Sequence, residues 1–150
     1  MNLLEPHEKL MVADKIKKFT PCGWFKQDRI IAITTENIYN IKGDSVKRRI
    51  QISSLAGISK NMIGGKNEII YHVAGEYDYR YFAEVRRQEF IDAAKLAYAV
   101  KQQNNLPVYG IEKTSIKNFV TCEKLARKGV SRIPPSHFRI AEEDILKDVP

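Results

Sequence analysis

Residues 22–57 read CGWFKQDRIIAITTENIYNIKGDSVKRRIQISSLAG, and this stretch decides the fold of the chain. Three apolar runs, at residues 30–33, 38–41 and 50–55, alternate with short polar connections. Runs of this length that are rich in Ile and Tyr and bounded by Asn, Asp and Gly are typical of an antiparallel β-meander. Gly43 can adopt a positive φ at little cost, so a tight hairpin turn is predicted there. The first half of the chain is therefore predicted to form an antiparallel sheet.

Segments on both sides of this stretch extend the predicted sheet. Residues 68–73 and 79–84 each alternate in side-chain character, as a strand with one face on the core does. Upstream, the spacing of apolar residues at 10–16 predicts a short helix that leads into a strand at residues 15–20. We expect a bent antiparallel sheet of about seven strands.

The apolar period changes after this sheet. Residues 87–103 contain no Gly or Pro, and Phe90, Ala94 and Ala97 recur at helical spacing. A single amphipathic helix that follows an antiparallel sheet must cap one open end or face of it. The chain is therefore predicted to be an α+β protein in which this helix covers the sheet through Phe90, Ala94 and Ala97.

The rest of the chain is less regular. We predict two short strands within residues 108–120, a short helix at 121–128 ended by Gly129, and another helix at 139–149. The chain is thus divided into a domain at residues 1–128 and a partly helical extension at 129–150. Part of the extension is predicted to lie as a strap along a partner, with packing on its own domain as the alternative. The strap residues are Ile133, Pro134, Pro135, Phe138 and Ile140.

Positive charge is concentrated in the first half of the sequence. The whole chain carries a net charge of +7. Residues 15–66 hold eleven basic and three acidic side chains, a net +8, and the remainder holds fourteen and fifteen, a net −1. This asymmetry favours an acidic partner, although a solvated basic face that keeps the protein soluble is an equal alternative. Nucleic acid ranks third, because alternation separates Phe82 from the tyrosines that could stack with it on bases.

The sequence has no recognisable catalytic or metal-binding motif. His7, His72 and His137 are far apart and have no metal-ligand spacing, so neither a metal nor a cofactor is expected. His72 is predicted to be an ordinary polar residue on a strand. The two cysteines, Cys22 and Cys122, are expected to be reduced thiols. No nucleophile motif or paired carboxylates are recognised, so the chain is predicted not to be an enzyme.

Four pieces of sequence occur in an order that resembles a known family. They are residues 12–18 (VADKIKK), 25–34 (FKQDRIIAIT) with 37–40 (NIYN), 50–59 (IQISSLAGIS) and 89–98 (EFIDAAKLAY). Together they resemble the tail homology domain of class I myosins, a pleckstrin-homology-like module, over roughly residues 8–120. The resemblance implies a seven-stranded, strongly bent sheet closed by a C-terminal helix, here as a module without a motor.

The resemblance also implies a basic face that docks onto acidic phospholipid. The head-group ligands implied by position are Lys17, Lys18, Lys26 and Arg29, with Lys42, Lys47, Arg48 and Arg49 nearby. This chain has Gln27 and Asp28 where the family commonly has a basic residue just ahead of the arginine. Aspartate beside a phosphate repels it, so the binding is expected to be weak and not stereospecific.

These observations predict a non-catalytic docking or adaptor module. The first expectation is a structural subunit bound to the acidic protein surface of a cytoskeletal assembly, either microtubule-based or ciliary or actin-based. The alternative is a peripheral membrane module that binds acidic phospholipids or phosphoinositides through the basic patch. The protein is expected in the cytoplasm, at the cytoskeleton or a cilium, or at the membrane periphery. No apolar run reaches the length of a transmembrane segment.

Overall fold

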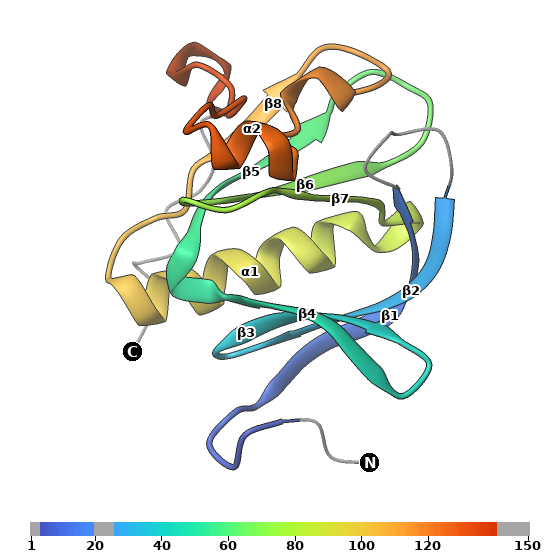
Figure 1. Ribbon diagram of the computed structural model, residues 1–150, viewed down its shortest axis with the longest axis vertical. Coiled ribbons are helices and arrows are strands. Elements are labelled where there is room, and N and C mark those ends of the chain that lie inside the picture. The colour runs from blue at the N-terminus through green and yellow to red at the C-terminus, as the bar shows by residue number, and fades with distance from the viewer. Residues whose placement is uncertain (1–3, 20–25, 141–150) are drawn as a thin grey trace.

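The computed structural model describes residues 4–19 and 26–140, which form one strongly bent sheet around a long helix (Figure 1). The sheet has the strand order β4-β3-β2-β1-β7-β6-β5-β8. The strands are β1 (Leu10–Phe19), β2 (Lys26–Thr34), β3 (Asn37–Lys42), β4 (Ser45–Gln51), β5 (Leu55–Asn61), β6 (Glu68–Val73), β7 (Tyr79–Phe82) and β8 (Val108–Ile111). The helices are α1 (Arg87–Gln102) and α2 (Glu123–Arg127), with short 3-10 turns at Ile52–Ser54, Glu84–Arg86, Lys117–Phe119 and Ser136–Phe138.

The meander forms as the sequence predicts. Strands β2, β3 and β4 pair antiparallel, and Gly43 turns the β3–β4 hairpin with a φ of +62°. A β-bulge between Asn40 and Ile41 shifts the register of this pair, which increases the local twist. The hairpin prediction is thus confirmed.

Two sequence predictions of secondary structure are wrong. The segment predicted as a helix at residues 10–16 is the first part of strand β1, because Val12 and Ile16 face the core equally well at strand spacing. Residues 108–120 hold one strand and a 3-10 turn instead of two strands. That strand, β8, pairs parallel with β5, and it brings the sheet to eight strands. The helix predicted at 139–149 lies almost wholly outside the described residues.

The helix α1 fills the concave side of the sheet (Figure 1). Phe90, Ala94 and Ala97 are all buried, and the Phe90 ring meets the edge of Tyr81 at a centroid distance of 5.8 Å. The main core joins these residues to the inward side chains of β1 to β8. The prediction that this helix closes the sheet is therefore confirmed.

A second apolar cluster covers the outer face of the sheet at strands β6 and β8. Ile70, Tyr109, Ile111 and Ile116 are buried there, under Phe119, Val120, Ile133 and Phe138. Strand β6 is consequently buried on both faces. Its outward residues are covered by the segment that follows β8.

The described part of the extension packs on its own domain. Ile133 and Phe138 join the outer cluster, Pro134 is buried and Pro135 is exposed. The Ile140 amide donates to the carbonyl of Val108 at 2.9 Å, and its side chain fills the space beside Gly110 where a Cβ would collide with it. These contacts agree with the alternative prediction that the extension packs on its own domain. Its role as a strap along a partner stays a prediction.

Candidate anion-binding site

The pairing register separates the basic residues of β1 and β2 onto two faces. Ile16 pairs with Arg29 and faces the core, whereas Lys17 pairs with Asp28 one position further on. Because successive side chains of a strand point to opposite faces, Lys18 and Arg29 point inward and Lys17 points outward. The four residues predicted as one head-group site therefore do not form a single group.

Three inward cations lie near one another by the C-terminal end of β1. Lys18 lies over the Tyr79 ring, with its Nζ 5.6 Å from the ring centroid. Arg48, on β4, stacks on Tyr77 at 3.7 Å and donates to the Tyr77 carbonyl at 2.6 Å. Arg29 and Arg48 both lie close enough to raise the electrostatic potential at Lys18 and Tyr79. We call Lys18, Arg29, Arg48 and Tyr79 the mouth cluster.

Buried polar atoms of this region lack hydrogen-bond partners among the residues that the structure describes. They are Arg29 Nε, Asn40 Oδ1 and the Tyr79 hydroxyl. Tyr79 is only 2% exposed. A buried donor or acceptor without a partner costs about 1–3 kcal/mol, so such atoms need an explanation when they gather in one place. A polar ligand or solvent that enters the mouth would satisfy them.

Burial disfavours the positive charges of Lys18 and Arg48, and repulsion from the neighbouring arginines adds to this effect at Lys18. Burial, with help from Arg29 and Arg48, lowers the pKa of Lys18. Burial likewise lowers the pKa of the Arg48 guanidinium and raises the pKa of the Tyr79 hydroxyl. Like charges brought together in a partly buried site are the arrangement that an anionic ligand stabilises.

Acidic groups stand at the border of the mouth. Glu123, at the start of α2, acts on Lys18 in the direction opposite to the cations, and Glu76 and Asp78 act in the same way on Arg48. Arg29 itself donates to the Asp28 carbonyl at 2.7 Å and to Gln27 Oε1 at 3.2 Å. The mouth is therefore positive at its centre and bordered by acids, which limits the charge that a ligand can bring.

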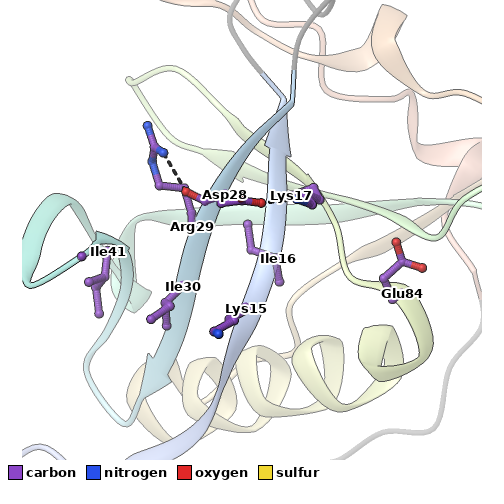
Figure 2. Close-up of a pocket in the computed structure, with 9 residues that line it drawn as sticks. Lys15, Ile16, Lys17, Asp28, Arg29, Ile30, Ile41 and Glu84 are labelled. Carbon is purple, nitrogen blue, oxygen red and sulfur yellow. Dashed lines mark hydrogen bonds and ion pairs between the residues drawn. The ribbon is translucent and has the colours of Figure 1, made fainter.

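The outward residues form a different surface. Lys17 and Asp28 make an ion pair across β1 and β2 (Figure 2). This pair lines a hollow of about 480 Å³ together with Lys15, Ile30 and Ile41 (Figure 2). Arg29 of the mouth cluster also lines this hollow, so the two surfaces adjoin at Arg29. Asp28 thus neutralises Lys17 on the outer face, and it does not point into the mouth as the sequence analysis assumed.

The remaining predicted ligands are dispersed. Lys42, Lys47 and Arg49 are exposed on the β3–β4 hairpin, where Arg49 pairs with Tyr39 on the outer face. Lys26 is exposed and lies over Phe82. Sequence reasoning missed Asn40 and Tyr79 as site residues. Their positions on predicted strands were the available signal, but the folded sheet was needed to place Asn40 opposite Arg48 and Lys18 over Tyr79.

A buried network elsewhere was also missed. Ser59 Oγ lies 2.6 Å from His72 Nε2, and His72 Nδ1 lies 2.8 Å from Asp78 Oδ2. This is the hydrogen-bond order of a catalytic triad, but Ser59 is fully buried. The network instead ties the chain together, because Asp78 also accepts from the Thr121 amide at 2.9 Å. His72 is therefore a structural core residue.

The described ranges, 4–19 and 26–140, contain no group of three or more His, Cys, Asp or Glu side chains that could hold a metal ion. Within the same ranges, no helix is long and apolar enough to span a membrane.

Comparison with known proteins establishes the fold. No family model matches the sequence, and no curated protein matches it. The hSac2 domain of the human phosphoinositide phosphatase Sac2 is similar in structure, with a TM-score of 0.54 at 17% identity over 74% of this chain and 81% of that domain. The N-terminal PH domain of human ARAP2 has a TM-score of 0.52 at 14% identity, over 77% of this chain and 97% of that domain.

A third similar structure is the PH domain of human oxysterol-binding-protein-related protein 11, with a TM-score of 0.51 at 12% identity over 66% of this chain and 86% of that domain. At these identities the likeness concerns the fold alone. The finer resemblance to the class I myosin tail homology domain stays a prediction. The chain has a pleckstrin-homology-like fold, in which a large bent sheet is closed by a helix.

Proposed function

We propose that this chain is a non-catalytic docking module that binds the phosphorylated head groups of acidic phospholipids at the mouth cluster. The observation that carries the proposal is the convergence of Lys18, Arg29 and Arg48 on a place where buried polar atoms lack partners. A phosphate group offers several acceptor oxygens and negative charge, so it would satisfy Arg29 Nε and the Tyr79 hydroxyl and offset the repulsion among the cations.

The fold supports a lipid before a protein as the first candidate. The similar structures include a domain of a phosphoinositide phosphatase. The acids bordering the mouth favour a compact anion over an extended acidic surface, because an extended surface would bring more negative charge close to Glu76 and Glu123. The geometry therefore favours a peripheral membrane module, which the sequence analysis gave as the alternative function.

Replacing Lys18 and Arg29 together with Gln should weaken binding to vesicles that contain phosphatidylinositol bisphosphate by about tenfold or more. Each basic residue near an anionic surface contributes about 1 kcal/mol, and each factor of ten is about 1.4 kcal/mol. Vesicle sedimentation at two ionic strengths measures the change. The matched control, Lys9→Gln with Lys128→Gln, removes two exposed charges outside the mouth. Equal losses in both variants would show that only net charge matters and would contradict the site.

Lys18→Met should leave the protein as stable as the wild type or up to about 1 kcal/mol more stable, although it removes a ligand contact. Burial and the neighbouring arginines lower the pKa of Lys18, so its charged form is disfavoured by folding. This penalty is fully present below the lowered pKa and disappears as the pH rises toward the unfolded value. Thermal unfolding should therefore show an advantage of the variant at neutral pH that shrinks in alkali. A destabilised variant would mean that Lys18 supports the fold.

Docking onto an acidic cytoskeletal surface is the second candidate. The observation that favours it is the exposed β3–β4 hairpin, which carries Lys42, Lys47 and Arg49 away from the mouth. Co-sedimentation with microtubules or actin filaments, compared between wild type and the triple Gln variant of these residues, separates the two candidates. Strong filament binding that is lost in the hairpin variant and unchanged in the Lys18 and Arg29 variant would favour the cytoskeletal function.

A further inference from the structure

Two lysines from distant segments share one aromatic ring on the outer face of the sheet. Lys26 Nζ lies 4.6 Å from the centroid of Phe82, and Lys66 Nζ lies 5.2 Å from the same centroid. Lys26 begins β2, and Lys66 belongs to the β5–β6 loop. Cation–π attraction explains why one ammonium lies over the ring, but a second ammonium beside the first is repelled by it.

The surrounding structure holds these two cations in place. The Phe82 ring is fixed by an edge contact with Phe19 at a centroid distance of 4.2 Å. Gly65 precedes Lys66 and has a φ of +70°, which a residue with a side chain rarely adopts. A Cβ on Gly65 would also lie 3.4 Å from the Thr114 carbonyl. The loop is therefore shaped by glycine to bring Lys66 over Phe82.

Among the described residues, the neighbouring acids only partly offset the charges of Lys26 and Lys66. Contact with the Lys66 side chain lowers the pKa of Lys26, and loss of solvent and charge repulsion by Lys66 lower it further. Glu84 only partly opposes this shift. Glu68 is already paired, since it accepts from Arg80 Nε at 2.7 Å in a buried ion pair. A bound anion would therefore reduce the repulsion between the two ammonium groups.

A hollow of about 290 Å³ lies beside Lys66 and the Phe82 ring that it shares with Lys26. Its walls include Lys66 and Phe82 together with Lys117 and the hydroxyl residues Thr114 and Ser115. The ion-paired side chains of Glu68 and Arg80 line it as well. Ammonium and hydroxyl groups are donors that suit the oxygens of a phosphate. The hollow is therefore lined by the donors that a small phosphorylated group requires.

This hollow is separate from the mouth cluster. Lys17 pairs with Phe82 across β1 and β7, and Lys18 pairs with Tyr81. Cross-strand partners share a face, so Phe82 lies on the outer face while Lys18 and Tyr81 lie on the inner one. A ligand at Phe82 would leave the mouth accessible.

We propose that Lys26 and Lys66, over Phe82, form a second binding site for a phosphate monoester, with Lys117, Thr114 and Ser115 as further donors. The monoester belongs either to a lipid head group or to a soluble phosphorylated compound. The site does not depend on the mouth cluster, and it can exist whether or not the mouth binds lipid.

The first test is NMR titration of the lysine side chains with inorganic phosphate in the full chain. Ionic strength is held constant with chloride, because exposed charges are screened by salt. Binding of the anion should raise the pKa of Lys26 by about one unit, since an opposite charge at close range favours the charged form. The rise should be lost in Lys66→Gln and kept in Lys18→Met. An unchanged Lys26 titration in the wild type overturns the proposal.

The second test identifies the source of the phosphate. Lys26→Gln with Lys66→Gln is compared with Lys9→Gln with Lys128→Gln on vesicles that contain phosphatidic acid, and with soluble glycerol phosphate. A loss of about 30-fold on vesicles that the control does not share assigns the group to a lipid, at about 1 kcal/mol for each lysine. A loss confined to glycerol phosphate assigns it to a soluble compound. Equal behaviour of the two double variants toward both ligands contradicts the site, and because both retain the mouth cluster, this result leaves the proposed function intact.

Discussion

Replacing Phe90 with Ala should lower the free energy of unfolding by about 3–5 kcal/mol. The ring is fully buried on α1 and packs against Tyr81 at the centre of the main core. Its removal leaves a cavity that a closely packed interior cannot fill, so both the transfer free energy and the packing contacts are lost. Chemical denaturation followed by circular dichroism measures the change.

Leu96→Ala is the matched control on the same helix, because Leu96 is 41% exposed. Its truncation should change stability by about 0.5 kcal/mol or less, as is usual for surface positions. Similar losses in the two variants would mean that the buried face of α1 is not the one described.

Asp78→Ala should be about as destabilising, at about 3–5 kcal/mol. The Asp78 carboxylate accepts from the Val73 amide at 3.1 Å and from the Thr121 amide at 2.9 Å, and it contacts His72 Nδ1 at 2.8 Å. With Nδ1 protonated, His72 donates to Asp78 and accepts from Ser59 at Nε2. Removing the carboxylate leaves these buried donors without a partner.

Hydrogen exchange separates the local effect of Asp78→Ala from the global one. The amide of Thr121 should lose protection first, and the segment that covers the outer cluster should follow it. Asp92→Ala, on the exposed side of α1, is the control with the same chemical change. Full protection at Thr121 in the Asp78 variant would refute the role of this carboxylate as a tie.

The parts of the fold that depend on local pattern could be predicted from the sequence. The meander follows from the apolar runs of β2 and β3 and the short polar connection between them, and the turn at Gly43 follows from its conformational freedom. The helix that carries Phe90 follows from its period. The helix predicted at residues 10–16 failed because Val12 and Ile16 are four residues apart, and that spacing puts both on one side of a helix and also on one face of a strand.

Features that depend on contacts distant in sequence could not be predicted in this way. The parallel pairing of Ile58 with Val108 joins segments on either side of α1, and no local period encodes it. Lys17 and Lys18 are neighbours in sequence, so they looked like one site until the register placed them on opposite faces. The approach of Lys66 to Lys26 has the same origin, because a loop between β5 and β6 meets the start of β2 only in the folded sheet.

The two edges of the sheet are protected against self-association in different ways. At β8, the backbone is partly covered by the chain's own later residues, where Tyr109 bridges to Arg139 and Ile140 donates to Val108. At β4, no further strand of the described residues pairs with the edge, but Lys47 and Arg49 are exposed there and the bulge beside Ile41 twists the hairpin. Charged side chains and bulges prevent an exposed strand from pairing with the strand of another molecule. The basic hairpin therefore protects this edge of the sheet against pairing with another molecule, whatever the protein binds.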